Sequence, residues 1–198
     1  QLTNGKGKIS TVEIISATKK VAEVKIISTS HIATRTSNIT IAVSLIKNTN
    51  RFEWFLEKAT EIGVSEIIPL ICERTEKQSF RYERMKNILV SAMLQSQQAW
   101  LPILHEPTKF VDLIKNGSYS KKFIAYCDDG EKDNLASQVL PMVEDLGGAI
   151  ILIGPEGDFT KEEIEDAKQN NFMPVGLGQN RLRTETAAMV ACVLLNQK

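Results

Sequence analysis

The chain has 198 residues, of which 42% are hydrophobic and 24% are charged, as in an ordinary globular protein. No apolar run approaches the roughly 20 residues that cross a bilayer, and no basic segment followed by an apolar one marks a secretory leader. Lys and Arg together number 24, as do Asp and Glu, so the net charge is zero. This composition argues against membrane-spanning and secreted proteins, and we expect a cytoplasmic protein with no membrane partner.

The charge is unevenly distributed along the chain. Residues 1–50 contain seven Lys or Arg and two Glu, a balance of +5, whereas residues 51–198 have a balance of −5. A basic segment next to an acidic remainder favours a polyanionic partner for the first part. A solvated charged surface is the plainer explanation, and charge alone leaves both open.

The three cysteines give no sign of a disulfide framework. Cys72, Cys127 and Cys192 are far apart, and each lies within an apolar run. We therefore expect buried, reduced thiols. The acidic segment 128–133 lacks the spacing of a calcium loop and predicts a solvated loop. No metal site is expected.

The first 30 residues alternate apolar and polar side chains, which is typical of strands. Residues 12–14 and 22–26 both alternate in this way, on either side of a turn at 17–20. A lone hairpin is marginally stable in water, so we expect partner strands that precede Gln1. The polar, Ser/Thr-rich segment 28–38 is typical of a linker.

From Ile39 onward, strand patterns alternate with helix patterns. Strands are expected at 39–46, 66–71, 103–105, 122–127, 150–153 and 173–177, and helices at 50–63, 80–99, 109–115, 135–143, 160–170 and 184–195. Such alternation predicts a mainly parallel sheet covered by helices on both faces.

Capping signals support several of these helices. Asn50 and Glu53 have the spacing of a capping box, as do Thr160 and Glu163. Gly63 follows an amphipathic stretch and predicts a glycine C-cap. The last helix, 184–195, is apolar on most sides, so we expect it to be deeply buried or to lie in a subunit interface. The residues that give it this character are Ala187, Met189, Val190, Val193 and Leu194.

The glycine-rich turn at Gly154–Gly157 is the most informative local feature. It follows the apolar strand 150–153 and precedes a helix, which is where ligands bind in open α/β sheets. A second run, 176–187, has the same character, so one ligand pocket built from both segments is expected. A tight strand–helix connection explains the first turn equally. The first strand is followed by 47–50 without glycine, which argues against a conventional dinucleotide fold.

The second run also carries charged candidates. Thr184 is expected to be the N-cap of the last helix, with Glu185 in the first turn, where the helix dipole favours an acid. Neither role requires Arg183. An arginine at the mouth of a cleft can orient an anion or stabilise negative charge that develops on a reacting base.

Several separated motifs together resemble the RsmE family of 16S ribosomal RNA uracil-N3 methyltransferases, which belong to the SPOUT superfamily. The resemblance covers roughly residues 39–198. It rests on Leu152–Gly157, Phe159-Thr160-x-x-Glu163, Leu177–Ala187, Arg51–Val64, Pro69-Leu70 and Glu73-Arg74. The sequence departs from the pattern in two places. Asp158 stands where many members have a second glycine, and Leu94–Gln98 stands where many have a glutamate before the glutamine and an arginine near the end, the latter replaced by Gln98. We expect these changes to affect RNA contact more than the methyl-donor site.

The resemblance implies a fold and an assembly. It implies a SPOUT-type, trefoil-knotted parallel sheet with helices on both faces over residues 37–198. Residues 1–36 would then be a linker and part of a PUA-like β-barrel that helps to recognise RNA. The family is dimeric, which implies a homodimer with the C-terminal helix near the interface.

The resemblance also implies the chemistry. S-adenosyl-L-methionine would donate a methyl group to N3 of a uridine in 16S ribosomal RNA of the small subunit. The cofactor-binding residues implied are Leu152, Ile153, Gly154, Pro155, Glu156, Gly157, Leu177, Gly178, Leu182, Thr184, Thr186 and Ala187. Arg183, Glu185 and Glu156 are the catalytic candidates: Arg183 to stabilise charge on the uracil or to pair with a carboxylate, and the two acids to orient the donor or the base. Arg51, Lys58, Arg74 and Arg181 are candidates for RNA contact, although surface ion pairs explain each of them equally.

Two other functions stay open. One is a SPOUT methyltransferase that acts on another RNA, such as a ribose hydroxyl of transfer RNA. The other is a non-catalytic RNA-binding or ribosome-assembly protein that kept the fold.

Overall fold

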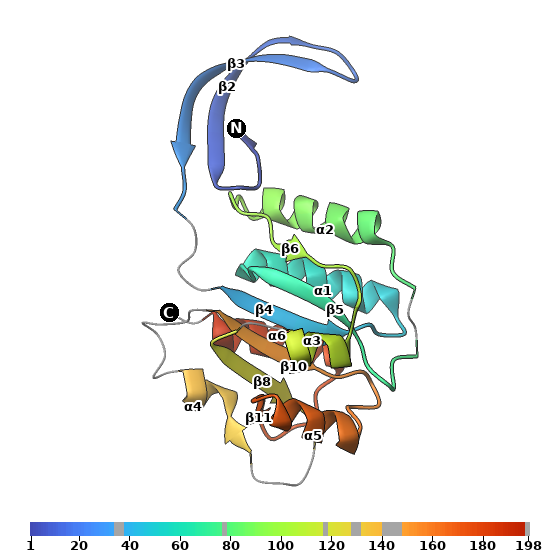
Figure 1. Cartoon of the computed structure of the whole chain (residues 1–198). Helices are drawn as coiled ribbons and strands as arrows, with labels where there is room; N and C mark the ends of the chain where they lie inside the picture. Colours follow the sequence, from blue (N-terminus) through green and yellow to red (C-terminus); the bar gives the residue numbers. More distant parts are fainter. Residues whose placement is uncertain (34–37, 77–78, 117–118, 128–131, 140–147, 197–198) are drawn as a thin grey trace.

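The computed structural model describes residues 1–33, 38–76, 79–116, 119–127, 132–139 and 148–196. A small antiparallel sheet at the N-terminus projects from a larger α/β unit (Figure 1). The elements are β1 (Leu2–Thr3), β2 (Lys8–Ala17), β3 (Ala22–His31), β4 (Ile39–Ser44), α1 (Thr49–Ile62), β5 (Glu66–Ile71), α2 (Tyr82–Gln95), β6 (Ile103–Leu104), β7 (Thr108–Lys109), α3 (Phe110–Asn116), β8 (Lys121–Ala125), β9 (Asp133–Asn134), α4 (Leu135–Val139), β10 (Ala149–Ile153), α5 (Lys161–Gln169), β11 (Met173–Gly176) and α6 (Thr184–Leu195).

The larger sheet confirms the expected parallel architecture. Its strands run in the order β6-β5-β4-β10-β8-β11-β9, with β7 also paired to β5, and every recorded pairing is parallel. The two central strands, β4 and β10, are buried along their whole length. Their continuous apolar sequences follow from this, because helices cover both faces of the sheet. The short strands β1, β7 and β9 were not expected from the sequence.

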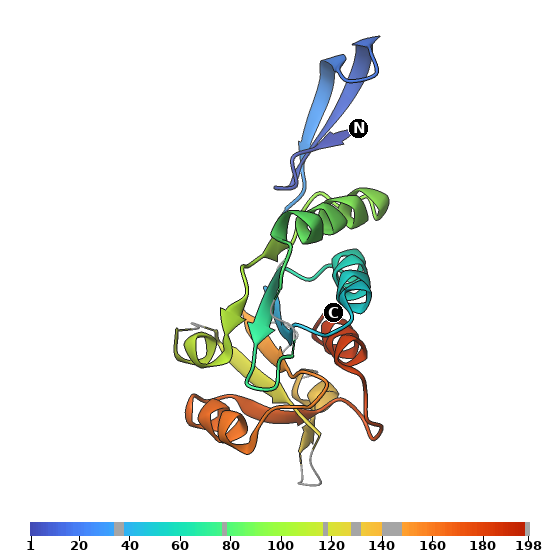
Figure 2. The same ribbon diagram turned by 90° about the vertical axis from the view of Figure 1, so that its right-hand side faces the viewer.

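Helices form one layer on each side of the sheet (Figure 2). On one side α1 and α6 pack together, and Phe52, Phe55, Leu89 and Leu195 belong to a single core there. On the other side α3 and α5 pack together over a second core that contains Phe110 and other apolar residues. Within the described residues, no helix is long and apolar enough to span a bilayer.

The N-terminal hairpin is confirmed, but one boundary was wrong. β3 continues to His31, so residues 28–31 are strand and not linker; residues 34–37 of that segment lie outside the described residues. Ser28–Ser30 pair with 9–11 of β2, and Ser10 and Thr29 share a hydrogen bond of 3.1 Å between their hydroxyl oxygens. Polar side chains suit this strand because its side chains are exposed.

The N-terminal sheet is joined to the larger unit through the chain that follows α2. The amide of Gly7 donates to the carbonyl of Ala99 at 2.9 Å, and the amide of Leu101 donates to the carbonyl of Gly5 at 2.9 Å. Between them, Trp100 lies against Gly7, and its indole nitrogen donates to the Ile32 carbonyl at 3.2 Å. These contacts explain why α2 ends at Gln95 and does not reach Ala99 as expected, because Ala99 and the residues that follow it contact the N-terminal sheet.

Two of the expected helix caps were wrong and two are confirmed. The N-cap of α1 is Asn48, two residues before the expected Asn50, and its side chain accepts from the Asn50 amide. Glu53 instead pairs with Arg84 of α2, with N–O distances of 2.5 and 2.9 Å. Gly63 caps the other end of α1 with a left-handed φ of 100°.

The other two caps lie in the C-terminal part of the chain. Thr160 and Glu163 form the complete capping box of α5. The N-cap of α6 is Arg183 and not Thr184, which is already helical and has a buried side chain. The prediction that α6 is largely buried is confirmed on one face, through Ala188, Ala191, Cys192 and Leu195. Val193 is exposed, and the other four residues named for its apolar character are half-buried.

The cysteines are free thiols in two environments. Cys72 and Cys192 are buried as expected, but Cys127 is exposed because β8 ends at Ala125 and the chain emerges from the sheet. Burial raises the pKa of the Cys72 thiol well above its ordinary value. The expected helix at 135–143 is described only as α4, and residues 140–147 lie outside the described residues, as do 128–131 of the acidic loop.

Candidate functional site

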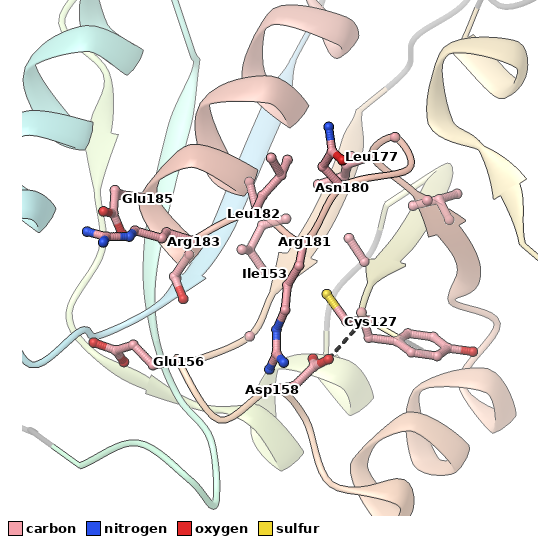
Figure 3. A pocket seen from close by; sticks show the side chains of 18 of the residues that line it. Cys127, Ile153, Glu156, Asp158, Leu177, Asn180, Arg181, Leu182, Arg183 and Glu185 are labelled. Atoms are coloured by element: carbon pink, nitrogen blue, oxygen red, sulfur yellow. Dashed lines mark hydrogen bonds between the residues drawn. The ribbon is translucent and has the colours of Figure 1, made fainter. Parts of the chain in front are cut away.

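One large pocket opens at the carboxyl ends of the central strands. Its volume is about 1050 Å³, and it is lined by residues that follow β8, β10 and β11, together with the start of α6 and Arg51 of α1 (Figure 3). The strand order explains the position. β4 connects outward to β5, while β10 lies on its other side, so the chain changes direction between two neighbouring strands. Ligands bind at such switch points in parallel sheets.

The first wall is the turn after β10. A Cβ atom built on Gly154 would lie 3.1 Å from the Phe159 ring and 3.2 Å from the Phe159 amide nitrogen. Phe159 is itself buried against Phe110, with ring centroids 5.5 Å apart. Only glycine therefore leaves the backbone room to pass between the pocket and this aromatic pair. The Asp158 amide closes the turn on the Pro155 carbonyl at 2.9 Å.

Two carboxylates fix this wall to its neighbours. Glu156 accepts from the amide of Lys47, just beyond β4, at 3.0 Å. Asp158 accepts from the amide of Cys127, just beyond β8, at 2.7 Å, and from the Phe159 amide at 2.8 Å (Figure 3). Asp158 adopts a left-handed φ of 61°, which costs a non-glycine residue energy that these two hydrogen bonds offset. The turn is thereby tied to both strands that flank β10.

The second wall is the loop between β11 and α6. Gly178 adopts a φ of 122°, and residues 177–183 carry the chain along the pocket into the helix. Thr184 and Glu185 are buried at the start of α6. The expectation that the two glycine-bearing segments form one pocket is confirmed, because both line it.

Charged side chains gather around the pocket. Arg51 and Glu185 form an ion pair of 3.6 Å between Nε and Oε1, and the Glu185 side chain is 11% exposed. Arg181 points across the pocket toward Asp158 (Figure 3). Arg183 also lines the pocket, and within the described residues it makes no ion pair.

The structure brings most of the candidate residues to this pocket. All three catalytic candidates line it, and so do Arg51 and Arg181. The cofactor-binding candidates that line it are Ile153, Gly154, Pro155, Glu156, Leu177, Gly178, Leu182, Thr184 and Ala187.

Five candidates lie elsewhere. Leu152 belongs to the core on the other face of the sheet, Thr186 is exposed, and the α-carbon of Gly157 faces Arg74. Lys58 bonds to Glu57 and Glu61 of its own helix, at 2.8 and 2.9 Å. Arg74 donates to the carbonyl of Gly157.

Sequence reasoning missed Tyr126, Cys127 and Lys132, which also line the pocket. The Lys132 ammonium donates to the Tyr126 carbonyl at 2.8 Å and lies 4.2 Å from the centre of the Tyr126 ring. These residues follow β8, whose carboxyl end lies beside the carboxyl end of β10. The sequence shows where the strand ends, but only the strand order shows that β8 and β10 are neighbours.

A family model described as an RNA methyltransferase domain matches residues 34–196. The chain belongs to this family. It is 32% identical over 158 residues to "Ribosomal RNA small subunit methyltransferase E" of Rickettsia conorii, a match covering 78% of the chain and 62% of that relative. The chain thus spans less than two thirds of this relative. The resemblance to the RsmE family is confirmed by this and other relatives of the same name.

Solved structures agree with this assignment. A probable rRNA methyltransferase from Porphyromonas gingivalis superimposes with a TM-score of 0.86 at 35% identity, covering 96% of the chain and 80% of that structure. A ribosomal RNA small subunit methyltransferase E from Neisseria gonorrhoeae, bound to S-adenosyl methionine, gives 0.82 at 28% identity, with 96% and 78% covered.

Proposed function

We propose that this protein transfers a methyl group from S-adenosyl-L-methionine to N3 of a uridine in 16S ribosomal RNA of the small subunit. The observation that carries the proposal is the single pocket formed by the turn after β10 and the loop before α6. Those two segments hold the motifs that resemble the RsmE family. The similar protein from Neisseria gonorrhoeae, crystallised with the same methyl donor, supports the choice of cofactor.

The lining of the pocket suits this donor. Ile153, Val175, Leu177, Leu182 and Ala187 supply apolar surface for a flat purine. Glu156, Asp158 and Glu185 supply negative charge, which attracts the positively charged sulfonium and ammonium groups. When bound, the donor supplies an electrophilic methyl group attached to sulfur.

Arg183 is the residue proposed to act on the base. N3 of uridine must lose its proton, here to solvent water, before it attacks the methyl carbon, and the negative charge left by the proton spreads onto the uracil carbonyl oxygens. The Arg183 guanidinium lines the pocket and can stabilise that charge as it develops on the base. The alternative role, pairing with a carboxylate, has less support because the recorded partner of Glu185 is Arg51.

The two acidic candidates, Glu156 and Glu185, are proposed to orient the donor or the base and not to exchange protons. Glu185 is held by Arg51 at the start of α6, and Glu156 is held by the amide of Lys47. Each carboxylate therefore has a fixed position in the wall of the pocket. Positioning of the donor and the base can supply much of the rate.

The RNA reaches the pocket from its open side. Arg51, Lys132, Arg181 and Arg183 surround the pocket and attract the phosphates that flank the target uridine. The base must leave its stack to enter, at a cost of a few kcal/mol.

The remaining features of the family are proposed with the activity. Residues 37–198 would form a trefoil-knotted SPOUT domain, and 1–36 part of a PUA-like barrel with its linker. A homodimer in the cytoplasm is proposed as well. The dimer is supported by Trp54 of α1 and Val193 of α6, apolar side chains that are 46% and 41% exposed on two helices that pack together.

The test is a methylation assay on small ribosomal subunits from a strain that lacks this protein. The full-length protein and S-adenosyl-L-methionine should restore N3-methyluridine, measured by mass analysis of nucleosides. Unmodified subunits together with methylation of a transfer RNA ribose in a parallel assay on transfer RNA, or no binding of the donor by calorimetry, would contradict the proposal.

A further inference from the structure

Arg74 joins the loop after β5 to the turn that forms the first wall of the pocket. Its Nη1 donates to the Gly157 carbonyl at 2.6 Å and to the Phe159 carbonyl at 3.4 Å. We propose that Arg74 is a positioning residue that holds this turn in its donor-binding form. The inference rests on the proposed function and departs from the expectation that Arg74 contacts RNA.

The loop that carries Arg74 is fixed on both sides of it. The Thr75 hydroxyl accepts from the Cys72 amide at 2.8 Å and bonds to the hydroxyl of buried Ser44 at 2.9 Å. The Glu73 amide donates to Glu163 at 2.9 Å, and Glu163 is buried in the capping box of α5. Arg74 therefore extends from a rigid base, which lowers the entropy cost of holding its side chain in one place.

Gly157 provides an independent argument for the contact. A Cβ atom on Gly157 would lie 3.3 Å from Cδ and 3.6 Å from Cβ of Arg74, with no other heavy atom outside its chain neighbours within 4 Å. The φ of Gly157 is not in the left-handed region, so the backbone itself does not require glycine. Glycine at this position thus makes room for the arginine side chain.

The contact orders the wall without entering the pocket. Pro155, Glu156 and Asp158 line the pocket, whereas neither Gly157 nor Arg74 does. The guanidinium holds the Gly157 carbonyl away from the donor while its neighbours face it. Loss of the guanidinium removes one of the contacts that tie the turn to its neighbours, while the Glu156 and Asp158 contacts stay, so part of the ordering must then occur on donor binding.

The test is calorimetric titration of S-adenosyl-L-methionine into the wild-type protein and three variants. R74A should bind about tenfold more weakly, which is the scale of a charge-assisted hydrogen bond that is partly exposed to water. R74K, which keeps the charge but cannot contact both carbonyls in the same way, should be intermediate. K58A is the matched control and should stay within about twofold of wild type, since in the described part of the chain Lys58 bonds to Glu57 and Glu61 of its own helix.

A second readout separates positioning from RNA contact. In the methylation assay R74A should raise the KM for the donor while kcat at saturating donor stays within about twofold and the KM for the ribosomal subunit is unchanged. A raised KM for the subunit with unchanged donor affinity would overturn the inference in favour of a phosphate contact. If wild type itself fails to bind the donor, the proposed function fails first and the inference falls with it.

The G157A variant keeps the test decisive even if R74A folds poorly, and a double-mutant cycle extends it where both variants fold. G157A retains the arginine but displaces it, and should weaken donor binding severalfold. In the R74A background the same change should add nothing, because the atom it would clash with is gone. Additive effects of the two changes would overturn the inference. Thermal unfolding without donor reports whether each variant is folded.

Discussion

Replacement of Gly154 by alanine tests whether the turn after β10 is shaped by close packing. The new methyl group would lie 3.1 and 3.2 Å from two carbons of the Phe159 ring and 3.2 Å from its amide nitrogen. Neither group moves easily: the ring is 3% exposed and packs on Phe110, and the amide is bonded to Asp158. The turn must therefore shift into the pocket.

The magnitude follows from overpacking in a well-packed region. Insertion of one methyl group into such a site costs about 1–3 kcal/mol. For a protein of this size, about 2 kcal/mol lowers the melting temperature by about 4–8 °C. Because the displaced turn is one wall of the pocket, affinity for S-adenosyl-L-methionine should fall about tenfold or more.

The assay is thermal unfolding combined with donor titration. G176A is the matched control, because Gly176 also lines the pocket, yet its added Cβ would meet nothing closer than the Asp133 carbonyl at 3.9 Å. It should change the melting temperature by no more than about 2 °C, in line with the small effect of a substitution that meets no clash. The reasoning is refuted if G154A has the same melting temperature as G176A and binds the donor as tightly as wild type.

Four further outcomes are expected. R183A should lower kcat about 100-fold with donor affinity within about twofold of wild type, measured by single-turnover methylation and calorimetry; an unchanged kcat would remove Arg183 from the chemistry. G7A, whose new Cβ would lie 2.4 Å from Cζ2 of Trp100 on a backbone with φ of 84°, should release the N-terminal sheet to limited proteolysis while donor binding persists; equal protease resistance would contradict this. Because the pKa of Cys72 is raised by burial, the folded state keeps its proton where the unfolded state loses it. The free energy of unfolding should then fall as pH rises above the ordinary thiol pKa of about 8.5, and C72A should remove that part of the slope; identical pH profiles would refute it. A thiol reagent at pH 8 should modify exposed Cys127 and spare Cys72.

The fold class was predictable because burial leaves a plain mark on the sequence. The run Ile150–Ile153 has no polar member, which is typical of a strand covered on both faces. The order of the strands within the sheet could not be predicted, because no sequence pattern shows which strands are neighbours. β10 lies between β4 and β8. Its pairing with β4 joins segments that are more than a hundred residues apart in the sequence. Residues that follow β8, such as Tyr126, therefore could not be assigned to the pocket.

Individual charged residues were harder to predict than the turns that carry them. Glu53 has the spacing of a capping residue, yet it pairs with Arg84 across two helices. Lys58 and Arg74 match the pattern of RNA contacts, yet the structure uses both within the fold. A charged side chain reaches over several ångströms in many directions, so its partner depends on neighbours brought in by tertiary structure.

The contacts of Gln98 and Asp158 show that the two departures from the family pattern lie in different parts of the structure. Gln98 donates to the carbonyls of Thr60 and Glu61, at 2.8 and 2.9 Å, near the end of α1 and outside the pocket lining. Asp158 lines the pocket and, in place of a glycine that would accept a left-handed φ freely, supplies a carboxylate that binds the Cys127 amide. The departure at 158 therefore concerns the donor-binding wall, whereas the expectation from sequence was that both departures affect RNA contact more than the donor site. An aspartate there adds a negative charge to the pocket wall and, through the Cys127 amide, a contact to the end of β8.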